Sequence, residues 1–555
     1  MKNLQSRQKQ IPIKSFFIFL AFLTAGSKLV IGQTYTEILG RPTDNSITVS
    51  VLFDQQVELY LEYGTIPGIY TSSTEIITNA INTPDEIELN NLNPDTKYYY
   101  CTLYRPVGSG PFLSSSEHSF HTQRAPGSTF SFTIEADEHL YDKKGIRSLY
   151  NICLANQAKD NPDFMFTLGD VFGDDHHPFD ITLHELDLLH KDYRQYFGNI
   201  CHSVPLYICL GNHEGEKDFY LHHTPPNNMA VYATLWRKFY FPNPYPNNFY
   251  SGNTDVEPYE IGNPENYYSW TWGNALFVVL DVYRDDCDTS AKPTNWEWSL
   301  GLPQYTWLKN TLENSNAQYK FVFAHHTRGE GRGGILTAKY FEWGGYEADG
   351  VTWGFASKRP GWDKPIHQLF VDNGVNIFFQ GHDHLFAHEV LDGVTYQEVP
   401  MPSDSTYEIG MLANAGAYTS DTLGGSGHLK VTVSPSCVKV DFIRAYLPAD
   451  TLSGIHHNRE VAFSYSIGNC SSEGTYDIIE NSTVKVFPNP AKDLLSVELP
   501  KDIGHPVFSI VNTFGQTILQ TKSRDFGLGG IQNGMYFLNI KTEFYEVNKK
   551  VVICH

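Results

Sequence analysis

Five short apolar runs in this chain are each followed by side chains that can bind a metal ion or move a proton. Mixed oxygen and imidazole donors of this kind suit zinc, manganese or iron, and imidazole also exchanges protons near neutral pH. One such block alone is explained equally well by a polar turn. Five blocks of the same kind indicate that their side chains form a common site. The runs and the residues after them are 130–136 with Asp137 and His139, 164–168 with Asp170, 204–210 with Asn212 and His213, 321–324 with His325 and His326, and 375–379 with His382 and His384.

Buried strands are the elements that would position these residues. The runs are short and mostly apolar, which is typical of a buried strand. Gly211 lets the chain turn sharply after its strand. The open sheets of α/β proteins bind ligands beyond the carboxyl ends of their strands, so we expect the five blocks to meet at one rim of one sheet. Helical patterns at 144–157 and 183–196 alternate with the strands, which predicts a layered α/β core.

In type and order these residues resemble the calcineurin-like metallophosphoesterase superfamily. Its pattern of Asp-x-His, Gly-Asp, Gly-Asn-His-Glu, His and Gly-His-x-His is matched block by block over roughly residues 130–446. Residues 266–269, the strand 275–280 with Asp281, and 304–308 before a helix also resemble purple acid phosphatases. The resemblance implies an α/β fold, a layered α/β/β/α metallophosphatase sandwich.

The resemblance also implies a site for two divalent metal ions (Fe, Zn or Mn), bridged by Asp170. His326 is an alternative to His325 as a ligand, and we favour His325 because it lies nearer the strand end. The implied first set is Asp137, His139, Asp170 and His384, and the implied second set is Asp170, Asn212, His325 and His382.

The chemistry expected of this site is hydrolysis of a phosphate ester. A hydroxide bridging the metals would attack phosphorus, while His213 protonates the leaving group or stabilises the transition state. Glu214 either orients the His213 ring or caps a turn, and both roles stay open. His326 and Arg328 are the candidate substrate contacts, with Arg332 as a second arginine able to bind phosphate.

We therefore expect a metal-dependent phosphoric ester hydrolase, similar to acid phosphatases, that acts on small phosphate monoesters. A phosphodiesterase or nucleotide-type hydrolase with the same site is the alternative. A non-catalytic surface binding protein is disfavoured, because every ligand position of the pattern is filled.

One departure from purple acid phosphatases bears on the metals. That family has an iron-binding tyrosine three residues after the aspartate of Gly-Asp, where this chain has Gly173, and it lacks the histidine that is His139 here. An imidazole in place of the phenolate would favour a divalent ion, and the iron-loaded protein would lack the purple charge-transfer band.

Composition bounds the remaining possibilities. A chain of 555 residues with 41% apolar and 14% aromatic residues can form roughly three or four well-filled domains. The net charge of −22 argues against nucleic acid as a partner. The eight cysteines contain no Cys-x-x-Cys pair; a Cys201–Cys209 bridge is conceivable, but we favour a buried free thiol at Cys209.

The order of segments predicts an exported protein. Residues 1–33 have the lysines and the short apolar run of a signal peptide, and no later run is long enough to span a membrane. Residues 34–126 resemble a fibronectin type III domain without chemistry of its own, 127–465 form the catalytic domain, and 466–482 form a linker. Residues 483–555 resemble a type IX secretion system sorting domain, which implies that this machinery exports the protein through the periplasm of a Gram-negative bacterium. The expected location is the medium or the cell surface.

Overall fold

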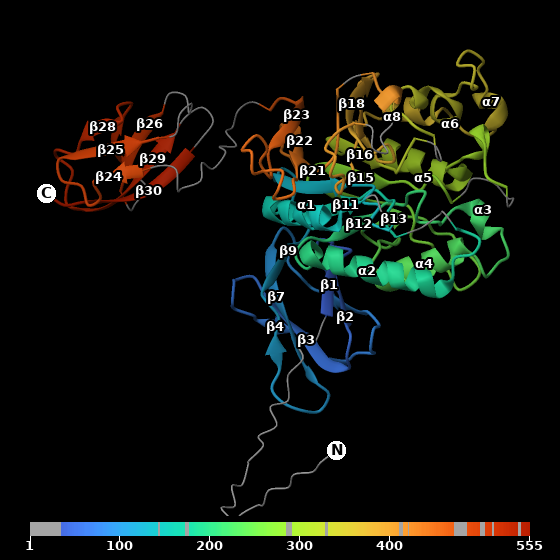
Figure 1. Cartoon of the computed structure of the whole chain (residues 1–555), viewed down its shortest axis with the longest axis horizontal. Helices are drawn as coiled ribbons and strands as arrows, with labels where there is room; N and C mark the ends of the chain where they lie inside the picture. Colours follow the sequence, from blue (N-terminus) through green and yellow to red (C-terminus); the bar gives the residue numbers. More distant parts are fainter. Residues whose placement is uncertain are drawn as a thin grey trace, which may run out of the picture.

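The computed structural model describes residues 35–141, 145–172, 177–284, 291–327, 331–409, 415–419, 421–470, 485–499, 506–512, 516–541 and 546–555. The predicted signal peptide, most of the predicted linker, Gly173 and Arg328 lie outside these ranges. Figure 1 shows three parts: an N-terminal module of strands, a central α/β domain and a C-terminal module of strands.

Two sheets form the centre of the molecule. The first has six strands in the order β12-β11-β10-β21-β22-β23, and the second has eight in the order β13-β14-β15-β16-β17-β19-β18-β20. The first contains β10 (Phe130–Glu135), β11 (Phe164–Thr167), β12 (Leu206–Ile208), β21 (Gly427–Val433), β22 (Cys437–Arg444) and β23 (Val461–Gly468). The second contains β13 (Ser251–Gly252), β14 (Tyr268–Trp272), β15 (Ala275–Val279), β16 (Tyr319–Phe323), β17 (Ile377–Gln380), β18 (Phe386–Leu391), β19 (Val394–Glu398) and β20 (Thr422–Leu423).

Aromatic side chains fill the space between the two sheets. Phe132 and Phe166 from the first sheet meet Phe277 and Phe323 from the second in one buried cluster. The rings of Phe166 and Phe323 stack with centroids 4.1 Å apart. Strands buried on both faces need continuous apolar runs, which is why these strands could be located from the sequence.

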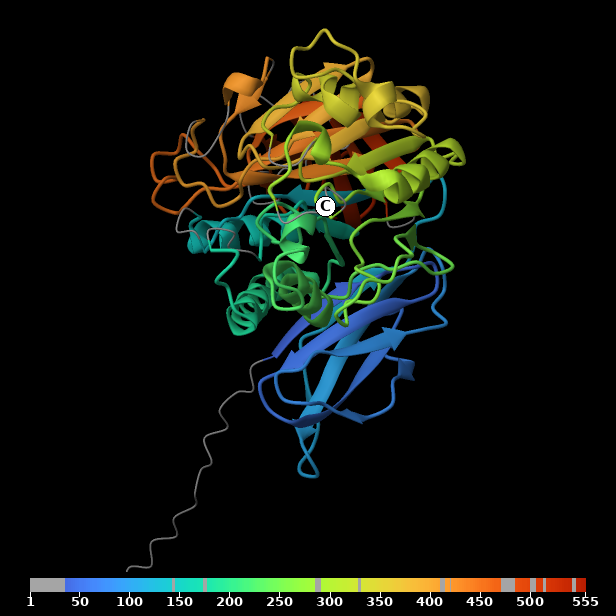
Figure 2. The same ribbon diagram turned by 90° about the vertical axis from the view of Figure 1, so that its right-hand side faces the viewer.

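Helices cover the outer face of each sheet, as Figure 1 and Figure 2 show. Helix α2 begins with a capping box, because the Thr182 hydroxyl accepts the Glu185 N–H and the Glu185 carboxylate accepts the Thr182 N–H. The layered α/β/β/α fold expected from the sequence is thereby confirmed. Helices α1 (Arg147–Asp160) and α2 (Leu183–Cys201) lie on the side of the first sheet, and α5 (Gly301–Glu313), α6 (Phe341–Gly344), α7 (Phe355–Lys358) and α8 (Ile366–Asp372) lie on the side of the second. Helices α3 (Asp218–Leu221) and α4 (Met229–Tyr240) lie between these groups, because Phe219 and Met229 share a buried cluster with Leu276 of β15 while α4 also contacts α2.

Three local expectations were wrong. Residues 304–308 lie inside α5 and not before a helix. The ligand-bearing strand ends belong to two facing sheets and not to one, because β16 and β17 lie in the second sheet. The chain also stays in the first sheet beyond residue 465, since β23 runs to Gly468 and a disulfide joins Cys437 to Cys470. Cys201 and Cys209 are both buried free thiols.

The N-terminal module packs tightly on the central domain. Its Ile38 and Leu52 belong to a buried cluster made mostly by residues of the central domain. The buried Arg194 of α2 donates to the Ser50 carbonyl at 2.8 Å and to the Thr36 hydroxyl at 3.0 Å. Its strands are β1 (Tyr35–Gly40), β2 (Ile47–Phe53), β3 (Val57–Gly64), β4 (Ser72–Ser73), β5 (Ile77–Thr78), β6 (Asp85–Leu89), β7 (Lys97–Pro106), β8 (Leu113–Ser114) and β9 (His118–His121).

The C-terminal module has its own core. Within the described part of the chain, this core takes all its residues from 491–553. Among the described residues, no helix is both long and apolar enough to cross a membrane. The strands of this module are β24 (Lys485–Phe487), β25 (Leu494–Glu498), β26 (Val507–Val511), β27 (Thr517–Thr521), β28 (Asp525–Gly527), β29 (Gly534–Lys541) and β30 (Glu546–Ile553).

Candidate metal centre

Left-handed backbone turns direct the candidate ligands over the strand ends. Among them, Asp137, His139, Asp170, His382 and His384 have φ values of 63°, 46°, 60°, 79° and 58°. This region is costly for residues other than glycine, and such residues concentrate at functional sites. The parallel strands β10, β11, β16 and β17 all end at this edge, so turns from both sheets converge there.

Two glycines let the turns after β11 and β12 touch. Gly169 has a φ of 101°, and a Cβ added there would lie 2.2 Å from the Gly211 nitrogen. A Cβ on Gly211 would lie 2.4 Å from an oxygen of Asp170. Neither position therefore accepts a side chain, and the close approach brings Asp170 beside the turn that carries Asn212.

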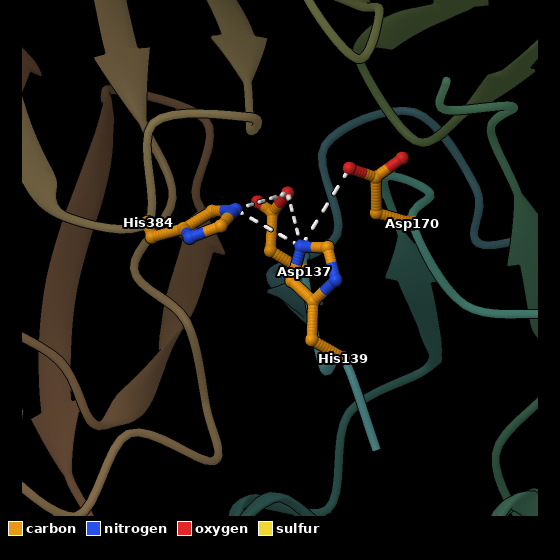
Figure 3. A group of neighbouring side chains, drawn as sticks. All are labelled: Asp137, His139, Asp170 and His384. Carbon is orange, nitrogen blue, oxygen red and sulfur yellow. Dashed lines mark hydrogen bonds and ion pairs between the residues drawn. The ribbon is translucent and has the colours of Figure 1, made fainter. Parts of the chain in front are cut away.

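The first group of side chains that could hold a metal ion is Asp137, His139, Asp170 and His384, whose ligand atoms all lie within 4.8 Å of one another. Figure 3 shows the His139 ring between His384 and Asp170. The His139 Nε2 lies 3.0 Å from the His384 Nε2 and 3.7 Å from the Asp170 Oδ2. All four side chains are buried, so this group is both polar and shielded from water.

The second group is Asp170, His325 and His382. The His325 Nε2 lies 3.2 Å from the Asp170 Oδ2, and its Nδ1 lies 2.8 Å from the Leu168 carbonyl oxygen. The Nδ1–H donates a hydrogen bond to that carbonyl, which leaves the lone pair of Nε2 to bind a metal ion. The centroid of the His326 ring lies 5.2 Å from that of the His382 ring, but the His326 Nε2 lies 3.1 Å from the Gly333 carbonyl oxygen. His325 is therefore the member of the pair that joins the group.

The buried atoms of the site fit a bound cation. The Asn212 Oδ1, the Asp137 Oδ1 and both ring nitrogens of His382 have no hydrogen-bond partner among the described residues. Buried polar atoms are normally satisfied, because leaving one without a partner costs about 1–3 kcal/mol. A metal ion would satisfy the two oxygens and one of the His382 nitrogens. The candidate ligands offer nitrogen and oxygen atoms only.

The charges of the site also favour a positive centre. Burial lowers the pKa of His325, but the carboxylates of Asp170 and Asp137 outweigh it and raise that pKa to about 9. Burial raises the pKa of Asp170, but His325 and His213 hold it well below its usual range. Asp170 thus remains anionic between the two groups, which is what a shared metal ligand requires.

His213 lies beside both groups without belonging to either. Its Nε2 lies 3.9 Å from the Asp170 Oδ2, and its ring meets the His139 ring edge-on with centroids 4.8 Å apart. The side chain is 17% exposed, whereas those of Asp137 and Asp170 are at most 1% exposed. His213 therefore faces the side from which a substrate would enter.

The Glu214 carboxylate binds backbone amides. It accepts the N–H groups of Asp170 at 2.9 Å and Phe172 at 3.3 Å, and it also accepts those of Val171 and Gly211. Of the two roles considered for Glu214, these bonds favour the structural one. Arg328 lies outside the described residues, and Arg332 donates to the His382 carbonyl and to Asp383.

Sequence reasoning missed three residues that surround the Gly-His-x-His turn. Asp383, Glu398 and Tyr418 are joined by hydrogen bonds behind the imidazoles. An aspartate between two candidate ligands is a signal that could have been found. Nothing in the sequence marks Glu398 or Tyr418.

Comparisons with known proteins agree with the fold. Residues 130–386 match the calcineurin-like phosphoesterase family, and residues 485–554 match the secretion system C-terminal sorting domain. A structure of PhoD is similar with a TM-score of 0.55 and 16% identity, covering 78% of this chain and 90% of that chain. A purple acid phosphatase from yellow lupin (Lupinus luteus) seeds is similar with a TM-score of 0.52 and 16% identity, covering 79% of this chain and 74% of that chain.

Comparison with curated proteins gives no match. At 16% identity the two solved structures show a shared fold. The family matches show that the chain contains a calcineurin-like phosphoesterase domain followed by a secretion system C-terminal sorting domain.

Proposed function

We propose that this protein is an exported hydrolase of small phosphate monoesters that works with two divalent metal ions. The observation that carries the proposal is the position of Asp170, which belongs to both groups of candidate ligands. The first ion would be held by Asp137, His139, Asp170 and His384, and the second by Asp170, Asn212, His325 and His382. Iron, zinc and manganese all suit these donors.

A bound metal pair would supply Lewis acidity, activating water and neutralising the charge of the phosphoryl oxygens. The protein supplies the fixed geometry. The Leu168 carbonyl holds the His325 ring in one tautomer, and Glu214 holds the backbone amide of Asp170. A site that is already rigid does not have to reorganise when the transition state forms.

His213 is the residue proposed to move a proton. Its ring lies next to Asp170 but outside both groups of ligands, on the exposed side of the site. From there, its Nε2 would donate a proton to the leaving alkoxide or stabilise charge on the phosphoryl group. A residue in this role lowers the barrier without being needed to bind metal.

The match to a sorting domain supports a reaction outside the cell. Its match over residues 485–554 indicates secretion or a cell-surface location. An exported phosphatase would release phosphate from esters in the surroundings of the cell. The secretion machinery is the partner that this module implies.

The test is hydrolysis of chromogenic esters by the metal-loaded protein. We expect p-nitrophenyl phosphate to be cleaved with a higher kcat/KM than bis-p-nitrophenyl phosphate, and metal removal to abolish both activities. Preference for the diester would replace the monoesterase with a phosphodiesterase or nucleotide-type hydrolase. Bound metal with no turnover of either ester would leave a binding protein and contradict the proposal.

A further inference from the structure

The turn Gly381-His382-Asp383-His384 carries one imidazole for each group of candidate ligands. His384 belongs to the first group and His382 to the second. Both histidines have a left-handed backbone, with φ values of 58° and 79°. Such a turn persists only when its surroundings hold it in place. Asp383 is the only residue between the two imidazoles.

The Asp383 carboxylate is fully buried and is bound by groups that are not candidate ligands. Its Oδ2 accepts the Tyr418 hydroxyl at 2.6 Å and the Gly333 N–H at 2.7 Å. Its Oδ1 accepts the Arg332 guanidinium at 3.0 Å. Arg332 also donates to the His382 carbonyl at 2.7 Å, which ties the turn to the segment after β16.

A second buried carboxyl group completes the support. Glu398, at the end of β19, accepts the Asp383 N–H at 3.0 Å and lies 3.0 Å from the Tyr418 hydroxyl. The preceding amide of the turn, that of His382, donates to the Asp137 Oδ2 at 2.8 Å. The turn is thus bonded through its backbone on one side and through the Asp383 side chain on the other.

We propose that Asp383 is a positioning residue that fixes the spacing of the two metal sites, with Tyr418 and Arg332 holding its carboxylate. The inference rests on the ligands assigned under the proposed function. Because His382 and His384 flank Asp383 on either side, a shift of this residue moves one ligand of each ion. A change at a ligand itself would remove donors from one site, or from both only at Asp170.

The test compares Asp383→Asn and Tyr418→Phe with the unchanged full-length protein. Zinc affinity is measured for each equivalent by competition with a chromophoric chelator, and thermal unfolding is measured on the metal-free protein. Asp383→Asn replaces one carboxylate oxygen, which accepts hydrogen bonds, with an NH₂ group that would face other hydrogen-bond donors. We therefore expect both zinc ions to bind roughly 10- to 100-fold more weakly. Tyr418→Phe removes one of the hydrogen bonds to the Asp383 carboxylate, and we expect a loss of roughly 2- to 10-fold at both sites.

Matched controls separate positioning from stability. Asp160 is a buried carboxylate paired with His428 and Arg459, and Tyr305 donates its hydroxyl to the Lys364 carbonyl. Neither residue contacts the turn in any of these bonds. Asp160→Asn and Tyr305→Phe should leave both zinc affinities unchanged, whatever they do to the unfolding temperature.

Two results would overturn the proposal: unchanged zinc affinities in a folded Asp383→Asn protein, or a loss confined to one equivalent. If Asp383→Asn shows no cooperative unfolding, and therefore is not folded, the same two criteria are applied to the zinc affinities of Tyr418→Phe. The readout is metal binding, so it is independent of hydrolysis. An unchanged protein that binds two zinc ions but cleaves no ester would contradict the hydrolase and leave the role of Asp383 intact.

Discussion

Replacing Glu214 with glutamine should loosen the loop that carries Asp170. In the structure, the buried Glu214 carboxylate accepts four backbone N–H groups, from Gly211 and from the three consecutive residues 170–172. A glutamine has nearly the same shape but offers only one acceptor oxygen. Its NH₂ group would point at amide donors, which it cannot bind.

The expected cost follows from the number of bonds. Two of the four N–H groups keep the remaining oxygen, and two lose their acceptor while staying buried. A hydrogen bond to a charged group contributes about 1.5–3 kcal/mol, so Glu214→Gln should lower the free energy of unfolding by about 3–6 kcal/mol. The bond from the Asp170 amide is among the four, so metal binding should weaken as well.

Urea unfolding of the metal-free protein measures the loss directly. Glu185→Gln is the control, because Glu185 is exposed and glutamine can replace glutamate in a capping box; we expect a change of at most about 0.5 kcal/mol. A loss below about 1 kcal/mol for Glu214→Gln would refute the role of its carboxylate in holding the loop.

Four further predictions follow from the site and the modules. Asp170→Asn should lose activity together with bound metal, whereas His213→Ala should keep its metal content and lose kcat; an empty site in the second variant would show that His213 is a ligand. His190 is buried, and burial lowers its pKa to about 4. The neutral His190 ring therefore makes its full contribution to the free energy of unfolding above about pH 6.5, and this contribution is lost as the pH falls towards 4. Wild type should lose about 2 kcal/mol more than His190→Gln between pH 7 and pH 5 in urea unfolding, and equal losses would contradict this. The iron-loaded protein should lack a purple charge-transfer band, since His139 lies in the first group; a strong band in the visible spectrum would mean that a tyrosine binds iron. Removal of residues 485–555 should leave a folded, active enzyme, because that module has its own core; insoluble or inactive protein would show that the module is part of the enzyme.

The sequence was most informative where burial and chemistry act on consecutive residues. Strands β11 and β17 are buried along their whole length, and three of the four residues of each are apolar. The candidate ligands follow these runs directly, and Gly169 and Gly211 mark turns that no side chain can enter. Local pattern and tertiary position agree at these places, which made the layered fold and the converging blocks predictable.

The supporting residues depend on contacts distant in sequence. Tyr418 is 35 positions away from Asp383 in the sequence, and no repeating pattern of residues predicts a contact at that separation. The disulfide between Cys437 and Cys470 is likewise set by the pairing of β22 with β23. β23 does carry an alternating signal at 461–467, but the polar composition that follows it suggested a linker.

Metal stoichiometry of the active protein is the most direct test of the binuclear site. Metal-free protein would be titrated with zinc or manganese, and hydrolysis of p-nitrophenyl phosphate would be recorded at each addition. The shared position of Asp170 predicts two equivalents per chain, with full activity only when both have bound. Full activity with one equivalent or none, or two bound equivalents without hydrolysis, would contradict a binuclear phosphoester hydrolase.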